Sequence, residues 1–187
     1  MSENLTHLKP AQCALLVVDI QERMMPVILE RERVIRNSVL LMKTANTLNV
    51  PIIATTQYVA KIGALLPEIQ AELNGVTPLD KFEFGCFGNK AIQKAAEALG
   101  GGVNTLIVCG VETHICIYQT VLGALKEGYN VWVASDAVSS RVPHNYETGL
   151  ERIRQIGGIV GSTEMIIYDL LMKAGTDEFR ALLPFLK

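Results

Sequence analysis

Short apolar stretches alternate along this chain with longer stretches in which apolar residues recur at helical spacing. The short stretches, such as residues 14–18, are apolar throughout instead of alternating with polar residues. Strands with this pattern are typical of parallel sheets that helices cover on both faces. The pattern predicts six strands, at residues 13–19, 51–56, 76–81, 105–110, 131–136 and 158–163.

Helices are expected in the longer stretches because their apolar residues repeat three or four positions apart. Asn89 is expected to cap one of these helices and Thr113 another, since both side chains accept hydrogen bonds from free backbone N–H groups. The triple glycine at residues 100–102 follows a helix and precedes a strand, which predicts a helix stop and a tight turn and not a dinucleotide-binding loop. The helices are predicted at residues 34–48, 89–99, 113–127, 146–156 and 176–186.

Strands that alternate with helices form βαβ units, which build a parallel sheet. We therefore expect an α/β fold with a six-stranded, doubly wound parallel sheet between two layers of helices. The 187 residues suffice for about one domain of average size, so residues 1–187 are expected to form a single domain.

Composition and charge narrow the classes of function. Hydrophobic residues make up 49% of the chain and charged residues 19%, which excludes a disordered or collagen-like chain. The net charge of −2 offers no basic excess for phosphates, so a nucleic-acid partner is not expected. No apolar run is long enough to span a membrane, and the polar start at residues 1–4 is unlike a signal peptide. A cytoplasmic protein with a small-molecule substrate is expected.

The cysteines are spaced irregularly, and neither a Cys-x-x-Cys pair nor a pair of histidines completes a zinc site. In a reducing compartment they are expected to be free thiols, most of them behaving as small apolar residues. No metal and no cofactor are expected. The four cysteines are Cys13, Cys86, Cys109 and Cys116.

Chemistry is expected at the carboxyl ends of the strands, where open parallel sheets bind their ligands. Asp19 and Lys81 end two predicted strands, and Cys116 lies just after a third. If Thr113 caps the helix, Cys116 is its third residue, where free N–H groups and the helix dipole stabilise a thiolate. Lys81 would lower the pKa of that thiol further, Asp19 could shuttle its proton, and nearby N–H groups could form an oxyanion hole.

Each of these residues also has a structural interpretation, which the sequence alone leaves open. Asp19 could cap a turn, Lys81 could be a solvated surface lysine, and Cys116 could be a small apolar residue. His114 lies only two residues from Cys116 and so points to a different helix face, which argues against a Cys–His pair. Asp136 is expected to cap the loop at residues 137–141.

Three segments are informative together: LVVDIQ at residues 16–21, KFEF at residues 81–84, and CGVETHIC at residues 109–116 with Thr120. They resemble the isochorismatase-like cysteine hydrolase superfamily. The resemblance runs from about residue 13 to residue 171. Residues 133–141 and 150–158 look most like the branch of isochorismatase domain-containing proteins.

The resemblance implies a Rossmann-like, isochorismatase-like hydrolase fold and a triad that falls on Asp19, Lys81 and Cys116. It also implies a cis peptide between Val111 and Glu112, with the N–H groups of Glu112 and Cys116 facing an oxyanion. The implied activity is hydrolysis of a small amide or related carbonyl compound through a thioester. The residues expected to line the substrate pocket are Gln21, Gln57, Tyr58, Phe84 and Thr113.

Two departures from relatives in this superfamily bear on the reaction. Nicotinamidases carry aspartate and histidine metal ligands after the second strand, but residues 55–61 contain neither type, so a metal is not expected. True isochorismatases lack the nucleophilic cysteine that Cys116 supplies here. The family commonly assembles, so a homo-oligomer, a dimer or higher, is expected.

Two other functions stay open on this fold. One is a non-catalytic, oligomeric interaction protein, in which Cys116 would have an ordinary thiol pKa. The other is a redox-sensing thiol protein, in which Cys86 could resolve an oxidised Cys116.

Overall fold

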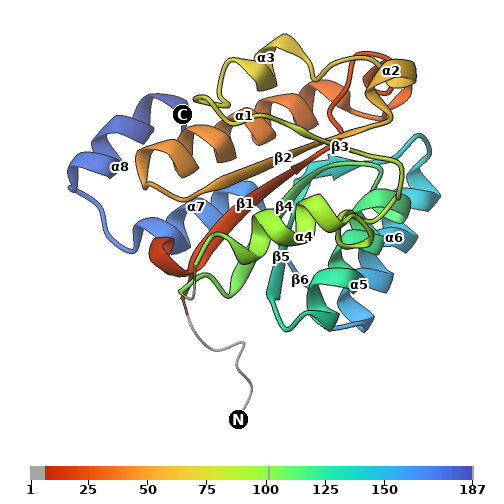
Figure 1. Ribbon diagram of the computed structural model, residues 1–187. Helices are drawn as coiled ribbons and strands as arrows, with labels where there is room; N and C mark the ends of the chain where they lie inside the picture. Colours follow the sequence, from red (N-terminus) through yellow and green to blue (C-terminus); the bar gives the residue numbers. More distant parts are fainter. Residues whose placement is uncertain (1–6, 101, 187) are drawn as a thin grey trace.

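Six parallel strands form one sheet in the order β3-β2-β1-β4-β5-β6 in a computed structural model that describes residues 7–100 and 102–186 (Figure 1). The predicted fold is therefore confirmed. The chain moves outward from β1 to β3 and then returns to the other side of β1 with β4, which creates a switch point between β1 and β4. The strands are β1 (Cys13–Val18), β2 (Ile52–Gln57), β3 (Leu79–Lys81), β4 (Thr105–Val111), β5 (Asn130–Ser139) and β6 (Ile159–Gly161).

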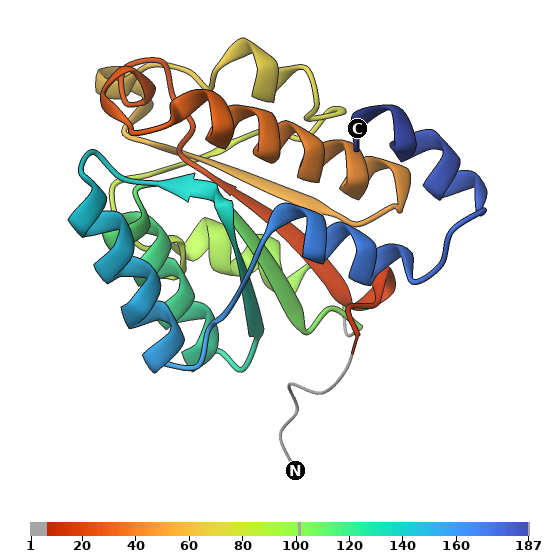
Figure 2. The same cartoon turned by 180° about the vertical axis from the view of Figure 1, so that it is seen from behind.

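Helices cover both faces of the sheet, as the view from behind also shows (Figure 2). Cys13, Leu15 and Val17 of β1 pack into the core beneath α1, α7 and α8. The alternate residues of the same strand enter the core beneath α4, α5 and α6. This two-sided burial explains the unbroken apolar strands. The helices are α1 (Arg31–Thr47), α2 (Val59–Ile62), α3 (Pro67–Gln70), α4 (Lys90–Glu97), α5 (Tyr118–Lys126), α6 (Pro143–Gln155), α7 (Thr163–Leu171) and α8 (Asp177–Leu182).

Several element ends differ from the prediction. The helix at α6 begins at Pro143, three residues early, because proline suits the first helical position. The last predicted strand ends at Gly161, since the Ser162 hydroxyl accepts a hydrogen bond from the Met165 N–H and caps α7, a helix that the apolar pattern did not reveal. The short helices α2 and α3 were not predicted either, and the last predicted helix ends at Leu182.

Other predicted ends are confirmed. Asn89 Oδ1 accepts hydrogen bonds from the N–H groups of Ala91 and Ile92 at the start of α4. Gly100 follows that helix with a φ of 89°, which favours glycine and suits the predicted stop. Gly101 and residues 1–4, on which the turn and leader predictions partly rest, lie outside the described residues. Within the described ranges, no helix is long and apolar enough to cross a membrane.

A glycine brings β4 against β1 at the switch point. Gly110 has a φ of 120°, and a Cβ atom on it would overlap the carbonyl group of Val18. The pairing of β4 with β5 also shifts register between Val108 and Gly110. The close approach places the residues that follow β1 and β4 beside each other at the carboxyl edge of the sheet.

Candidate active site

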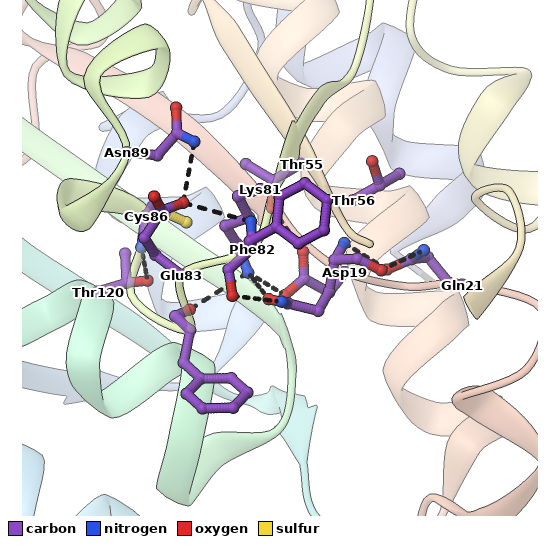
Figure 3. A network of polar contacts seen from close by, with 12 residues as sticks. Asp19, Gln21, Thr55, Thr56, Lys81, Phe82, Glu83, Cys86, Asn89 and Thr120 are labelled. Carbon is purple, nitrogen blue, oxygen red and sulfur yellow. Dashed lines mark hydrogen bonds and ion pairs between the residues drawn. The ribbon is translucent and has the colours of Figure 1, made fainter. Parts of the chain in front are cut away.

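Asp19 follows β1 directly and is fully buried. Its Oδ1 accepts a hydrogen bond from the Thr55 hydroxyl at 2.8 Å, and its Oδ2 accepts one from Lys81 Nζ at 2.6 Å (Figure 3). Both partners of this carboxylate are side chains, so Asp19 is not the backbone cap of the structural interpretation. Its φ of 55° is one that aspartate tolerates better than most residues.

Lys81 ends β3 and is also fully buried, which rules out a solvated surface lysine. Its Nζ donates to Asp19 Oδ2 at 2.6 Å, to Gln57 Oε1 at 2.7 Å and to the Phe84 carbonyl at 3.2 Å. An ammonium group has three N–H donors and no acceptor, so three acceptors match the protonated form. Burial opposes that charge, but the negative partners around Lys81, Asp19 foremost, outweigh burial and raise its pKa.

A buried pair of this kind is a poor source of stability, since removing two charges from water costs several kcal/mol per ion. Replacing such a pair by apolar residues is often neutral or stabilising. Stability therefore does not explain the Asp19–Lys81 pair, which favours a role in a reaction.

Cys116 lies in a five-residue π-helical turn, Thr113–Ile117, that leads into α5. The predicted Thr113 cap is wrong. Glu112 occupies the cap position, and its carbonyl accepts hydrogen bonds from the N–H groups of Ile115 and Ile117. The Thr113 hydroxyl is buried and has no hydrogen-bond partner among the described residues. The peptide bond between Val111 and Glu112 is cis.

Cys116 is 4% exposed, and its thiol lies close enough to the Asp19 carboxylate for that group to act on its pKa. Burial, followed by the negative charge of Asp19, raises the pKa of Cys116 from 9.0 to about 12, although Lys81 opposes the shift. The predicted low-pKa thiolate is therefore contradicted. Lys81 already neutralises Asp19 at 2.6 Å, so its charge does not stabilise a thiolate as a free lysine would. The resting site holds a thiol beside a carboxylate.

Burial also raises the pKa of Asp19, against the opposing effects of Lys81, Thr55 and Cys116. A raised pKa means a stronger affinity for a proton, which suits a general base. Asp19 and Cys116 thus form an acid–base pair whose proton can move when the sulfur attacks. Among the described residues, none accepts a hydrogen bond from the Glu112 N–H.

Two of the expected pocket residues bond to other parts of the protein: Gln57 to Lys81, and Gln21 to the backbone of Gln57. Gln57 is 8% exposed, and both ends of its amide bond to other parts of the protein. Gln21 is fully buried, and its amide bonds to the backbone of Gln57 and Gly63. A third expected pocket residue, Thr113, is also fully buried.

The other two expected pocket residues, Tyr58 and Phe84, are exposed. Tyr58 follows Gln57 in the chain, and Phe82 and Phe84 come one and three residues after Lys81. We call these three side chains the aromatic rim. Their exposed fractions are 38%, 66% and 54%. The rings of Tyr58 and Phe82 lie 4.7 Å apart between centroids. Exposed aromatic side chains therefore begin directly after Lys81 in the chain.

The remaining candidates have structural roles. His114 bonds to Ser140 and Asn145, away from Cys116. Asp136 accepts hydrogen bonds from the N–H and hydroxyl of Thr163 at the start of α7, which differs from the predicted loop cap because β5 continues to Ser139.

Cys86 is a second thiol on which the charges of Asp19 and Lys81 act. It is fully buried, and its N–H donates to the hydroxyl of Thr120, one helical turn beyond Cys116. Burial, followed by the charge of Asp19, raises its pKa to about 11. Burial likewise raises the pKa of Cys109, inside β4, to about 12.

Sequence reasoning missed two supporting residues, Thr55 and Arg141. The Thr55 hydroxyl donates to Asp19, and the N–H and Nε of Arg141 donate to the Glu112 carboxylate at 3.0 and 3.1 Å. Thr55 and Arg141 lie near the carboxyl ends of β2 and β5, and only that position could have drawn attention to them.

No group of three or more His, Cys, Asp or Glu side chains in the described ranges is arranged to hold a metal ion. A surface hollow of about 810 Å³ lies against α1, and none of Asp19, Lys81 and Cys116 lines it.

Comparisons with known proteins connect this geometry to a family. Residues 13–165 match the isochorismatase domain. The chain is 34% identical over 189 residues to the secreted isochorismatase effector Isc1 of Phytophthora sojae, covering 100% of this chain and 90% of that protein. It superposes with a TM-score of 0.90 on the MAR1 ribonuclease of Caenorhabditis elegans at 27% identity, covering 97% and 92% of the two chains. The YcaC protein of Escherichia coli, an octameric hydrolase of unknown specificity, has the same fold at 24% identity, with a TM-score of 0.91 and coverage of 99% and 91%.

Proposed function

Because the chain belongs to the isochorismatase domain family, we propose that it is a hydrolase in which the Cys116 thiol attacks the carbonyl of a small amide or related substrate. One observation carries this proposal. The Asp19–Lys81 pair is fully buried, with 2.6 Å between Nζ and Oδ2, and its carboxylate acts on the pKa of the nearby Cys116 thiol.

The first half of the reaction forms a thioester. Asp19 takes the proton of the Cys116 thiol as the sulfur bonds to the carbonyl carbon, and the carbonyl oxygen becomes an oxyanion. The N–H groups of Glu112 and Cys116 stabilise that oxyanion. The C–N bond then breaks, and the amine leaves with the proton that Asp19 had taken.

The second half restores the enzyme. Water enters in place of the amine, and Asp19 removes its proton as the oxygen attacks the thioester carbon. The C–S bond breaks, the acid product leaves, and the sulfur recovers a proton from Asp19. The sum is one amide and one water converted to one acid and one amine. Throughout, Lys81 keeps its charge, which balances the negative charge of Asp19 at rest and that of the oxyanion once Asp19 holds the proton.

The test is to incubate the protein with a panel of small primary amides and anilides and to measure amine release and the mass of the intact protein. We expect an acyl adduct on the peptide that contains Cys116, and loss of turnover in Cys116→Ala. Cys109→Ser is the matched control, because Cys109 is an equally buried thiol away from Asp19. Turnover by Cys116→Ala, or neither turnover nor adduct with any amide, would refute the proposal.

RNA cleavage is the second candidate, because the MAR1 ribonuclease shares the fold at 27% identity. The chain's net charge of −2 offers little attraction for a polyanion, which favours the small substrate. A single-stranded RNA oligonucleotide in the same panel separates the two. Cleavage of RNA that survives Cys116→Ala would support a ribonuclease without the thiol chemistry.

We also propose that the protein acts as a homo-oligomer. The octameric E. coli relative and the exposed aromatic rim support this proposal. A purely monomeric species in sedimentation at micromolar concentration would contradict it. A cytoplasmic location stays a prediction, and one relative is a secreted effector.

A further inference from the structure

Gln57, the last residue of β2, connects the triad to the segment that carries the aromatic rim. Its Oε1 accepts a hydrogen bond from Lys81 Nζ at 2.7 Å, and its Nε2 donates to the Phe82 carbonyl at 2.9 Å. Both ends of the amide are therefore occupied. A carbonyl cannot donate, so the contact with Phe82 fixes which end of the amide is nitrogen, and the oxygen must face Lys81.

A second glutamine holds Gln57 in this position. Gln21 Oε1 accepts a hydrogen bond from the Gln57 N–H at 2.7 Å, and Gln21 Nε2 donates to the Gln57 carbonyl at 3.2 Å (Figure 3 shows Gln21 beside Asp19). Gln21 Nε2 also donates to the Gly63 carbonyl at 2.7 Å. Gln21 thus pairs with the backbone of Gln57 as a neighbouring strand would, which leaves the Gln57 side chain little freedom.

The fixed amide has a consequence for Lys81. An oxygen at 2.7 Å pairs with an N–H donor, so the Gln57 amide favours the ammonium form of Lys81 over the neutral amine. Gln57 Oε1 and the Phe84 carbonyl, 3.2 Å from Nζ, accept two of the three N–H bonds of Lys81. The third N–H bond is therefore directed at Asp19. Without Gln57, one N–H of a fully buried ammonium would lack an acceptor, which is costly.

We propose that Gln57 is a positioning residue that stabilises the ammonium group of Lys81 and directs it at Asp19. Its effect on catalysis rests on the proposed hydrolase function, whereas its effect on Lys81 does not. Gln57 therefore belongs to the catalytic machinery through Lys81 and not through contact with the substrate. Because it also holds the Phe82 carbonyl, it couples the charge of Lys81 to the position of the aromatic rim.

The test compares Gln57→Met, which keeps the side-chain length and removes the acceptor, with Gln57→Glu, which keeps an acceptor oxygen. The pKa of Lys81 is read by NMR of ¹³C,¹⁵N-lysine protein, with the signal assigned by its loss in Lys81→Arg. The charged or titratable groups that face Lys81 are Asp19, Cys116, Cys86 and the exposed Glu83, and none of them is changed. Gln93→Met is the matched control, because Gln93 donates to the Phe87 carbonyl in the same way but does not touch Lys81.

We expect the Lys81 pKa to fall by about one unit or more in Gln57→Met and to stay at or above the wild-type value in Gln57→Glu. Gln93→Met should leave it unchanged. If the role of Gln57 were purely structural, both Gln57 variants would have a lower melting temperature, and the pKa of Lys81 would be the same in the wild type and in every variant. That result would overturn the proposal.

The catalytic part is tested on any amide that the wild type hydrolyses. In Gln57→Met, kcat should fall at least about tenfold at neutral pH with KM within about twofold, because Gln57 does not contact the substrate. A change confined to KM would place Gln57 in the substrate pocket and overturn its positioning role. If the Lys81 pKa moves and the wild type hydrolyses no amide, the positioning of Lys81 stands and the hydrolase proposal fails.

Discussion

Replacing Asp19 by asparagine should make Cys116 more reactive toward an alkylating agent while abolishing turnover. After burial, the charge of Asp19 is the largest cause that raises the pKa of the Cys116 thiol, and Lys81 acts in the opposite direction. Asparagine removes the negative charge and leaves the positive one. The pKa of Cys116 should therefore fall, yet the variant lacks the base that accepts the thiol proton during catalysis.

The size of the effect follows from the charges. With a pKa of about 12, roughly one Cys116 in ten thousand is a thiolate at pH 8, against about one in ten for a thiol of pKa 9.0. Two unit charges ~4 Å apart at an effective dielectric constant of ~20 interact by ~4 kcal/mol, or ~3 pKa units, as an upper bound. We therefore expect the pKa of Cys116 to fall by ~1–3 units and its alkylation at pH 8 to accelerate ~10- to 1000-fold.

The assay is iodoacetamide labelling between pH 7 and 9.5, with the rate for each cysteine read by peptide mass spectrometry. Burial raises the pKa of Cys13 to about 11 and that of Cys109 to about 12, and neither depends on Asp19, so both serve as slow internal references. Cys86 is not a reference, because the charge of Asp19 also raises its pKa. The control is Glu83→Gln, which removes a negative charge close to Lys81 in sequence but fully exposed to solvent, where it is screened.

An unchanged or slower alkylation of Cys116 in folded Asp19→Asn would refute the reasoning, because the charge of Asp19 would then not govern the thiol. Equal acceleration in Glu83→Gln would also refute it, since the effect would not be specific to Asp19. Circular dichroism and urea unfolding establish that the variants are folded, so that faster labelling is not a sign of unfolding.

Two further predictions concern stability and are measured by urea unfolding. Lys81→Met leaves Asp19 buried without its partner and should lower the free energy of unfolding by ~3–5 kcal/mol. The double variant Asp19→Asn with Lys81→Met should recover most of this loss and remain inactive. A double variant less stable than Lys81→Met would show that the pair is kept for stability. Gly110→Ala places a Cβ atom against the Val18 carbonyl at a φ of 120° and should lower the free energy of unfolding by about 3 kcal/mol or more. The control Gly102→Ala makes only an ordinary contact at 3.5 Å and should change it by no more than about 0.5 kcal/mol. Wild-type stability of Gly110→Ala would contradict the close approach of β4 and β1.

Elements with a strong local signal were predictable from the sequence. The unbroken apolar run of β1 and the Asn89 cap of α4 depend on residues close together in the chain, and both were placed correctly. The helix α7 was missed because Thr163 was assigned to the preceding strand. The cap at Thr113 was wrong because a π-helical turn starts one residue earlier, and a local pattern does not distinguish that turn from an α-helix.

Of the candidate site, the sequence indicated which residue types stand at the carboxyl ends of the strands. Parallel strands bring these ends to one edge, so the neighbourhood of Asp19, Lys81 and Cys116 was expected from the order of elements alone. The roles of Gln21 and Gln57 were not, because a hydrogen bond between residues 36 positions apart leaves no periodic trace in the sequence.

What the sequence determined by itself is the fold and the identity of the reactive groups, since apolar patterning selects the sheet and side-chain chemistry is fixed residue by residue. Only the tertiary structure decided the protonation of those groups. On its own, a lysine beside a cysteine lowers the pKa of the thiol. In the fold, Lys81 is paired with Asp19, and burial and the charge of Asp19 raise the pKa of Cys116 to about 12. A pKa depends on solvent exclusion and on charges within a few ångströms, and both arise from segments that are distant in the chain.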